Sequence, residues 1–544
     1  MRVVLISLYD EWCLGLRSLS AVLKRDGHDA RLAWVHSLRQ INAGPDVAGP
    51  DGYFVPPASV PRRDLEALAQ LVRELQPGLI GIGHSSNFSG LAERVTRELR
   101  AVWPVPIVWG GVDTTANPDW AIQHADIICR GEGEGAMTEL ARRLEHGADP
   151  ADIPNLWVRR PDGQVARNPL RPLIEDLDAL PWADFDPAGK YWISDGRAQP
   201  GVIPKGSNLE HSFPTMASRG CLYACAYCCN SMYRELYGSK GYVRLRSPEH
   251  VVGEIEAYVT AHPAIDTVEF LDDVFGFKRE WVERFSQLYR ARVQLPFWFF
   301  TYPSVCRPEI LEPLKRAGAW FVVMGLQSGS QRTLNEDYCR RAPRERTLQA
   351  ARAIRDCGLP MIVDLIIGDP LETDADYRET LDLLLDFPRP FILHEVNHLG
   401  LYRNYPLTTR LMQAGLLPDF MPGRNATMTP LTADMRLWRA LFTMAQFEQV
   451  EPATLRAMAG DPFLRERPEV AEDLAAAMVD MTYIPGSRIP RQWAVQRQVD
   501  DLRGRLSRYE DSRMVQAYFR AKRMLRRARP DHFLSARSSP SSTR

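Results

Sequence analysis

The sequence has little of several features that would narrow its function at once. No apolar run reaches the ~18–20 residues needed to cross a bilayer. The 67 basic and 68 acidic residues leave a formal net charge of −1, which gives no whole-chain attraction to nucleic acids or acidic membranes. The chain begins with a short strand-like run, MRVVLISLYDEW, which soon meets acidic residues and is unlike a signal peptide. We therefore expect a cytoplasmic protein with no transmembrane segment and no nucleic-acid partner.

Cysteine is scarce, and its distribution is uneven. Only nine of the 544 residues are cysteine, and four of them fall within residues 221–229. In a reducing compartment, such grouping indicates a metal or catalysis more often than disulfides. A structural zinc site usually takes four ligands from two separated pairs. The sequence has no second C-x2-C pair, because the other cysteines stand singly at Cys13, Cys129, Cys306, Cys339 and Cys357.

The first part of the chain, residues 1–145, alternates apolar runs with amphipathic helical stretches. The runs RVVLISL, DARLAWV, GLIGIGH, PIVWGG and DIICRG are continuous rather than alternating, as in strands covered on both faces. Five such βα units predict a doubly wound parallel sheet, whose ligands bind beyond the carboxyl ends of the strands. The polar and glycine-rich turns expected there contain the candidate binding residues Ser85, Ser86, Gly110, Gly111, Gly131, Glu132, Gly133 and Glu134.

The rest of the chain divides into three parts. Residues 146–210 are rich in Pro, Asp and Gly and predict a linker. Residues 211–415 contain six further βα units, which predict a partial (β/α)6 barrel of the TIM type. Residues 416–544 predict a mainly α-helical region that ends in a basic, disordered tail. The whole chain is thus expected to be an α/β protein with a helical carboxy-terminal region.

The grouped cysteines form C-x3-C-x2-C at Cys221, Cys225 and Cys228, with Cys229 directly after. They follow the first predicted strand of the barrel, at the end where barrel enzymes place their chemistry. Iron–sulfur clusters are normally held by four cysteines. Three ligands leave one iron open, which suits a cluster that must bind a substrate.

In this place and spacing, the cysteine loop resembles that of the radical S-adenosylmethionine (SAM) superfamily. The resemblance implies that Cys221, Cys225 and Cys228 are the catalytic metal ligands of a 4Fe–4S cluster whose open iron chelates SAM. It also implies that SAM is cleaved to a 5′-deoxyadenosyl radical, which abstracts a hydrogen from an unactivated carbon. The family usually has an aromatic residue before the third cysteine. Tyr227 fits that position, so Cys228 rather than Cys229 is assigned as the third ligand.

Three downstream segments agree with this family. By resemblance, the turn GLQSGS places Gln327 and Ser328 against SAM, with Gln327 standing where many relatives carry Glu. The segment DLIIGDPLET places Ile366 near the adenine. FLDDVF ends the second barrel strand with Asp272 and Asp273, which would orient SAM or substrate; helix capping by one of them is an equal alternative.

The amino-terminal part, with IVWGGVDTT and ADIICRGEGEGAMTEL, resembles the Rossmann-like cobalamin-binding domain of cobalamin-dependent radical SAM enzymes. Its glycines would allow the close backbone approach that a bulky corrin needs. Cobalamin modules often carry D-x-H-x-x-G after strand one, with His as the cobalt ligand. Here that loop reads YDEWCLG and has no His, and His28 is interpreted as a surface turn residue. Many relatives of this class bind cobalamin without that His.

The resemblance implies an enzyme that methylates an unactivated carbon of a small molecule, using methylcobalamin as methyl donor and a flavodoxin- or ferredoxin-type one-electron reductant. A radical cyclase or rearrangement enzyme, like the anaerobic cyclases of tetrapyrrole synthesis, uses the same cofactors and stays open. A methylthiotransferase is a remote alternative, because such enzymes carry three further amino-terminal cysteines where this chain has only Cys13 and Cys129.

Overall fold

The computed structural model describes residues 1–8, 10–35, 60–201, 207–420 and 423–482. Residues 1–472 form one compact unit, to which all the elements described below belong except the end of the last helix. Within the described part of the chain, no helix is both long and apolar enough to span a membrane.

The first sheet is built around five parallel strands. These are β1 (Arg2–Leu8), β2 (Asp29–Val35), β3 (Leu79–Gly83), β4 (Ile107–Gly110) and β5 (Ile127–Cys129). Their spatial order is 2-1-3-4-5, so the chain reverses its winding direction between β1 and β3. In open parallel sheets, this reversal is where ligands bind.

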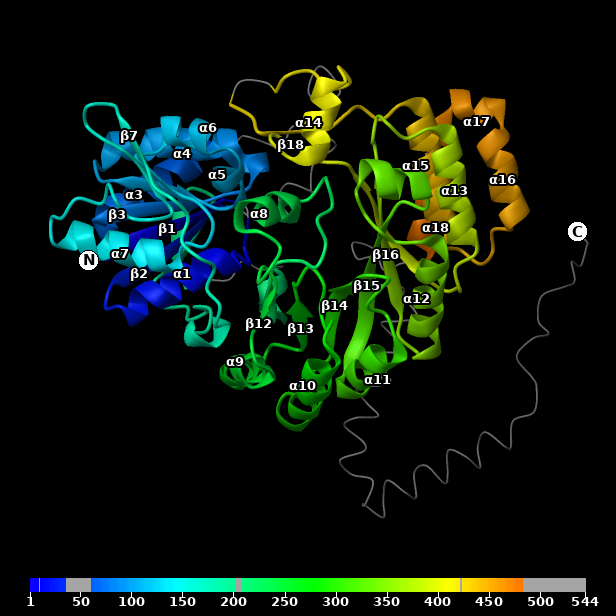
Figure 1. The fold of residues 1–544 in the computed structure, drawn as a ribbon, viewed down its shortest axis with the longest axis horizontal. Helices are drawn as coiled ribbons and strands as arrows, with labels where there is room; N and C mark the ends of the chain where they lie inside the picture. The colour runs from blue at the N-terminus through cyan, green and yellow to red at the C-terminus, as the bar shows by residue number, and fades with distance from the viewer. Residues whose placement is uncertain (9, 36–59, 202–206, 421–422, 483–544) are drawn as a thin grey trace, which may run out of the picture. The chain divides into compact units, whose positions relative to one another are not determined.

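Helices cover both faces of this sheet (Figure 1). One face buries its apolar side chains against α1 (Leu14–Arg25) and α7 (Glu134–Glu145). The opposite face carries α3 (Arg62–Leu75), α4 (Ser89–Val102) and α6 (Pro118–His124). The short helices η1 (Ser86–Phe88) and α5 (Val112–Ala116) follow β3 and β4. Burial on both faces explains why the strands are continuous apolar runs.

Residues 146–210, predicted to be a linker, instead extend both edges of the first sheet. The antiparallel strands β6 (Leu156–Arg159) and β7 (Val165–Arg167) add to β5. On the other edge, β8 (Lys190–Ser194) pairs parallel with β2, and β9 (Arg197–Pro200) pairs antiparallel with β8. Among the described residues, the sheet therefore has nine strands. The short helices η2 (Leu177–Ala179) and η3 (Asn208–Glu210) complete the segment.

The second sheet is the predicted partial barrel. Six strands are hydrogen-bonded in chain order, all parallel: β10 (Ser212–Thr215), β13 (Thr267–Phe270), β14 (Phe297–Thr301), β15 (Ala319–Gln327), β16 (Met361–Ile367) and β17 (Ile392–His398). The connecting segments contain α9 (Pro248–Ala261), α10 (Arg279–Arg292), α11 (Pro308–Ala317), η4 (Thr333–Asp337), α12 (Arg344–Asp356) and α13 (Asp374–Leu385). Local sequence begins two of these helices as predicted: Ser247 caps α9, and Thr373 with Asp376 forms a capping box on α13.

The segment between β10 and β13 carries the cysteine loop. A two-residue ribbon, β11 (Ser218–Arg219) paired with β12 (Arg244–Leu245), flanks α8 (Cys229–Tyr237). The first barrel strand ends at Thr215, so strand β11 of the ribbon lies between it and Cys221.

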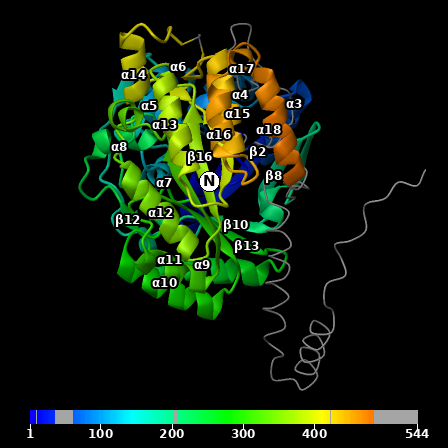
Figure 2. The ribbon, with the colours of Figure 1, turned by 90° about the vertical axis from the view of Figure 1, so that its right-hand side faces the viewer.

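After β17, the chain becomes mainly helical, as predicted. It contains β18 (Leu401–Tyr402), α14 (Pro406–Gln413), β19 (Ala426–Thr427), α15 (Ala433–Ala445), α16 (Pro452–Gly460), α17 (Pro462–Glu466) and α18 (Pro468–Thr482). Figure 2 shows α15 beside α13 and α16, with which it is in contact. The basic tail predicted at the end of the chain lies outside the described residues. The predicted α/β fold class, with its doubly wound first sheet, partial barrel and helical region, is confirmed.

Candidate functional site

The cysteine loop is a compact turn that is held by backbone contacts on two sides. The Cys228 N–H donates to the Cys225 carbonyl at 2.9 Å. The Ala226 N–H donates to the Tyr338 carbonyl at 2.9 Å, and the Leu407 N–H donates back to the Ala226 carbonyl at 3.0 Å. The loop is therefore tied to the segments after β15 and β18, which lie more than a hundred residues away in the chain.

Two side chains donate hydrogen bonds to cysteine sulfurs in this loop. Arg340 Nη1 lies 3.6 Å from Cys225 Sγ, and the same guanidinium also binds the Gly325 carbonyl. Asn230 Nδ2 lies 3.6 Å from Cys228 Sγ and 3.1 Å from Asp273 Oδ2. N–H donors of this kind stabilise negative charge on sulfur, which is the form in which cysteine binds metal.

The thiols of the loop differ in their ease of ionisation. A hydrogen bond from Cys229 lowers the pKa of Cys228 to about 7, whereas burial raises the pKa of Cys221 to about 12. The assignment of Cys228 rather than Cys229 as the third ligand stays a prediction. In the described residues, however, no three Cys, His, Asp or Glu side chains converge tightly enough to form a metal group as they stand.

The residues predicted to orient SAM or substrate at the second barrel strand have different surroundings. Asp272 is buried, and its carboxylate accepts hydrogen bonds from the Ala217 N–H at 2.9 Å and from the Ser218 hydroxyl. It therefore fixes the strand that leads into the cysteine loop. Asp273 contacts Asn230, as described above. Neither carboxylate caps the next helix, α10, which has no side-chain cap.

The predicted SAM turn after β15 is braced against the start of α13. The Ser328 hydroxyl donates to Glu372 Oε1 at 3.1 Å, and the Ser330 hydroxyl donates to Asp376 Oδ1 at 2.6 Å. Gln327 has a left-handed backbone, with φ of 74°. Its strand neighbour β16 carries Ile366, which is half-buried. The serines thus shape the turn, while Gln327 and Ile366 stay partly accessible beside it.

Next to this turn lies a buried carboxyl group, Asp369, that has an incomplete set of partners. Its Oδ1 accepts the Leu371 N–H at 3.0 Å, but Oδ2 is buried without a hydrogen-bond partner within the described part of the chain. Burial raises its pKa from 3.8 to about 6.

We expect the Asp369→Asn substitution to stabilise the protein in a pH-dependent way. Between pH 3.8 and 6, the folded state keeps a proton that the unfolded state has released, so stability falls as pH rises through this window and stays low above it. Asn has no such penalty. Denaturant titrations should show the stability advantage of Asp369→Asn widening by about 1 kcal/mol between pH 5 and pH 7. An advantage that does not change with pH would contradict this explanation.

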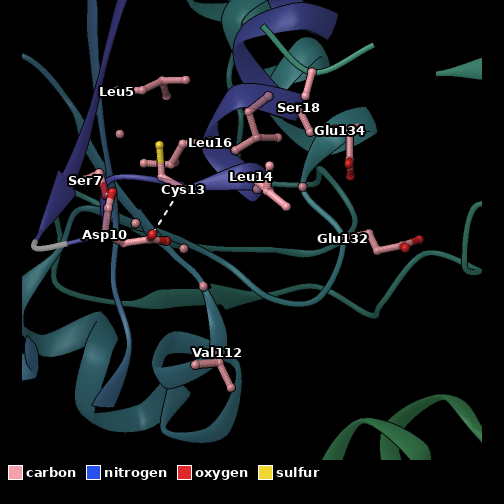
Figure 3. A pocket seen from close by; sticks show the side chains of 18 of the residues that line it. Leu5, Ser7, Asp10, Cys13, Leu14, Leu16, Ser18, Val112, Glu132 and Glu134 are labelled. Carbon is pink, nitrogen blue, oxygen red and sulfur yellow. Dashed lines mark hydrogen bonds between the residues drawn. The ribbon is translucent and has the colours of Figure 1, made fainter. Parts of the chain in front are cut away.

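A large cavity lies at the carboxyl ends of the first sheet, between β1 and β3. This cavity of about 700 Å³ is shown in Figure 3. Its inner wall is apolar and comes from the sheet and from α1 and α7; this wall includes Leu5, Gly81, Val108, Leu16, Leu19 and Met137. Its lining also contains polar residues, among them Asp10, Ser85, Glu132 and Arg219. A mainly apolar lining with a few polar groups is typical of a cofactor site.

Most of the predicted binding residues of the first domain line this cavity. They are Ser85, Gly110, Gly111, Gly131, Glu132, Gly133 and Glu134. Ser86 does not line it, although it lies in the same turn. The two glutamates do not face the cavity as free anions, because Arg219 and Arg244 pair with them.

The loop after β1 contributes residues that sequence reasoning did not select. Asp10 and Cys13 line the cavity, and the Cys13 N–H donates to Asp10 Oδ1 at 2.9 Å (Figure 3). With Asp10 and Gly15 taken as the ends of the D-x-H-x-x-G spacing, Trp12 stands at the His position. The spacing of the motif could have shown this, although the residue type differs.

A polar network joins the cavity wall to the segment after β18. The buried Asp113 carboxylate lies 3.6 Å from His84 Nδ1 and accepts hydrogen bonds from Asn117 Nδ2 at 2.7 Å and Asn425 Nδ2 at 3.2 Å. The Asn425 N–H also donates to Ser89 Oγ at 3.2 Å. Burial lowers the pKa of His84, which lines the cavity. A side chain more than three hundred residues away thus supports this wall.

Replacement of Asn425 by Ala should leave one oxygen of the buried Asp113 carboxylate short of a donor. Loss of one partner of a buried polar group costs about 1–3 kcal/mol. We expect the free energy of unfolding to fall by that amount in a denaturant titration, with Asn425→Asp more harmful because it sets two carboxylates together. Equal stability of Asn425→Ala and wild type would show that the contact carries no energy.

Comparison with known proteins identifies the two domains. The B12 binding domain family matches residues 1–141, and the radical SAM superfamily matches residues 216–384. The cavity lies in the first match, and the cysteine loop lies in the second.

Three relatives are identical to this chain at about a quarter of the aligned positions. An uncharacterized methyltransferase of Pyrococcus horikoshii is 26% identical over 58% of this chain and 65% of its own length. The anaerobic magnesium-protoporphyrin IX monomethyl ester cyclase of Rubrivivax gelatinosus is 25% identical over 59% of this chain and 56% of its own. The cytidylyl-2-hydroxyethylphosphonate methyltransferase of Streptomyces wedmorensis is 26% identical over 66% of this chain and 69% of its own length. The chain thus spans less than two thirds of the length of the first two relatives.

Solved structures share the fold. The radical SAM methyltransferase TsrM of Kitasatospora setae, with cobalamin and a 4Fe–4S cluster bound, superimposes with a TM-score of 0.56 at 18% identity, over 77% of this chain and 76% of its own. The cobalamin-dependent SAM radical enzyme OxsB, with aqua-cobalamin and SAM bound, has a TM-score of 0.60 at 14% identity, over 95% and 83%. At sequence identities this low, the structural similarity shows a shared fold only.

The two family matches confirm the cofactors predicted from the sequence, which are a 4Fe–4S cluster, SAM and cobalamin. The chain thus pairs a B12 binding domain with a radical SAM domain.

Proposed function

We propose that this enzyme methylates an unactivated carbon of a small molecule. One observation carries the proposal: the B12-domain cavity reaches the strand that leads into the cysteine loop. Arg219, two residues before Cys221, lines the cavity together with Met216 and Ser218. A methyl donor in that cavity would lie beside the source of the substrate radical, as methyl transfer requires.

The residues of the cysteine loop fit a 4Fe–4S cluster. Cys221, Cys225 and Cys228 would be its ligands, and the donors Arg340 and Asn230 point at two of their sulfurs. Hydrogen bonds to ligand sulfurs tune the potential of such clusters. The third sulfur, that of Cys221, belongs to a segment whose carbonyl accepts a hydrogen bond from Arg234 at 3.1 Å.

The cavity fits a cofactor with a bulky, partly apolar body. Two positions in the walls have no room for a side chain and are occupied by glycine. A Cβ at Gly81 would lie 2.8 Å from Leu5 Cδ2, and one at Gly111 would lie 2.5 Å from the His84 carbonyl oxygen. Ser85 and Asp10 supply polar groups in the lining. These residues would hold cobalamin.

When bound, the cluster with SAM supplies a 5′-deoxyadenosyl radical, and methylcobalamin supplies the methyl group. The chain's own residues would position these groups. We propose that Tyr227, Gln327, Ser328 and Ile366 contact SAM. Asp272 would hold the strand before the cysteine loop, and Asp273 would hold Asn230 in place as a donor to Cys228.

The proposal includes a cellular setting. The enzyme would act in the cytoplasm on a small-molecule substrate, with a flavodoxin- or ferredoxin-type protein as one-electron reductant. Support comes from the radical SAM domain and from the methyltransferases among its relatives.

Product analysis tests methyl transfer against cyclisation. Anaerobic enzyme is incubated with SAM, a reductant and candidate substrates. Methylation should yield S-adenosylhomocysteine beside 5′-deoxyadenosine, because a second SAM restores the methyl group on cobalt. The cyclase alternative, supported by the Rubrivivax relative, predicts 5′-deoxyadenosine without S-adenosylhomocysteine above background. If every substrate that the enzyme converts gives 5′-deoxyadenosine without S-adenosylhomocysteine, the proposal is overturned.

A further inference from the structure

The turn after β5, residues 131–134, contacts both flanks of the cysteine loop. On the flank before the cysteines, Arg219 Nη2 donates to Glu134 Oε1 at 2.5 Å, and Nη1 donates to Glu132 Oε1 at 3.1 Å. On the paired strand, Arg244 Nη1 donates to both oxygens of Glu132, at 2.9 and 3.0 Å. Both strands of the β11–β12 ribbon are therefore bound to one glutamate of the first domain.

The flank after the cysteines rests on the same turn. The last residue of α8, Tyr237, lies so close to Gly131 that a Cβ added there would be 1.7 Å from its Oη. The φ of Gly131 is +70°, and its N–H donates to Thr115 Oγ1 at 3.0 Å. This position thus needs glycine because of the helix that follows the cysteine loop, in addition to any cofactor.

Arg219 also contacts helix α1. Its Nη2 lies 3.3 Å from Ser18 Oγ on α1. Ser18, Glu132, Glu134 and Arg219 all line the cavity. The guanidinium is therefore held by two separate segments of the first domain while it is bonded to the strand that enters the cysteine loop.

We propose that Arg219, Glu132 and Glu134 are positioning residues that fix the separation between the cobalamin cavity and the cluster loop. Glu132 and Glu134, which the sequence suggested as cofactor contacts, act through arginines instead. The ion pairs are largely shielded from water, and a forked guanidinium between two carboxylates is directional. Loss of one partner leaves an unpaired charge and frees the ribbon. This inference rests on the proposed function only in naming the two cofactors.

The test uses full-length, anaerobically reconstituted protein with cobalamin supplied. The variants are Arg219→Gln, Arg219→Lys and Glu134→Gln, with Arg284→Gln as control, because Arg284 forms an exposed ion pair with Glu249 at 2.6 Å. Iron and cobalt per chain are measured first. Amide exchange of residues 218–237 is then compared, followed by the magnetic interaction between Co(II) and the reduced cluster in EPR spectra.

We expect Arg219→Gln and Glu134→Gln to keep iron and cobalt contents close to wild type. Exchange in residues 218–237 should be about tenfold faster, because the ribbon has lost an ion pair to the first domain and keeps only the others, such as Arg244–Glu132. The magnetic interaction between Co(II) and the cluster should weaken and become heterogeneous. Arg219→Lys should give values between those of wild type and Arg219→Gln. The control Arg284→Gln should match wild type. Unchanged exchange in both variants would overturn the proposal. So would loss of cobalt with unchanged exchange, which would make these residues cofactor ligands.

A second set of variants tests the other flank without relying on charge. Gly131→Ala should speed exchange of residues 218–237, because the new methyl group displaces Tyr237. Gly131→Ala combined with Tyr237→Ala should restore slower exchange than Gly131→Ala alone; no restoration would contradict the contact. If wild type binds no cobalt, the proposed methyl transfer fails, but the exchange measurements still decide whether the turn positions the loop.

Discussion

Replacement of Cys221, Cys225 and Cys228 together by alanine is expected to lower bound iron from about four atoms per chain to less than one. SAM cleavage should fall below detection, because only Cys229 remains in the loop and a single thiol cannot hold the cluster. Bound cobalt should remain, since none of the three cysteines lines the first-domain cavity. Iron and cobalt analysis with a 5′-deoxyadenosine assay measures all three quantities.

Single substitutions distinguish the third ligand from its neighbour. Cys228→Ala should behave like the triple variant in the SAM-cleavage assay, whereas Cys229→Ala should keep most of its iron. Cys229 directly follows Cys228 in the chain, so its loss should change the cluster's spectrum more than its occupancy. Cys357→Ala, in which a half-buried cysteine far along the barrel is replaced, is the control. Full iron in Cys228→Ala would show that the third ligand is assigned wrongly.

Gly111→Ala is expected to reduce bound cobalamin at least tenfold. The φ of Gly111 is +107°. The added Cβ would lie 2.5 Å from the carbonyl oxygen of His84 and 3.2 Å from the backbone nitrogen of His84. Both atoms belong to backbone, which cannot rotate away. The turns after β3 and β4 must therefore move apart, and both line the cavity.

Gly147→Ala is the matched control for this substitution. Gly147 also has a positive φ, +68°, but a Cβ there would meet nothing within 4 Å. It should cost about 1–2 kcal/mol of backbone strain and leave cobalt binding unchanged. Equal cobalt loss in both variants would mean that general instability, rather than the shape of the cavity, causes the defect. Cobalt per chain and a thermal denaturation curve separate the two.

The strands of both sheets could be predicted because their sequence patterns are strong. β1 and β2 occupy the predicted runs RVVLISL and DARLAWV, since strands buried on both faces must be apolar throughout. The edge strands in residues 146–210 were missed for the opposite reason. β7 has three residues, none of them buried, and β9 is half-exposed. Their conformation is set by pairing with β6 and β8, which local sequence does not reveal.

The candidate site was predictable where its residues are neighbours in the chain. The spacing of Cys221, Cys225 and Cys228 is visible in the sequence, and so are the glycine turns of the cavity. Arg340 and Arg219 were missed because their roles depend on contacts about 85 to 115 residues away. An isolated arginine in a sequence carries no sign of such a partner. The pairing of Glu132 with Arg244 could not be predicted for the same reason, because the two residues are 112 positions apart.

The most direct test of the account is the iron, sulfide and cobalt content of the anaerobically purified chain, expressed with cobalamin supplied. We predict about four irons, about four sulfides and about one cobalt per chain, with only the iron and sulfide lost in the Cys221/Cys225/Cys228 triple variant. Iron without cobalt would leave the radical SAM chemistry intact but remove the proposed methyl donor. Zinc in place of iron would contradict the account as a whole.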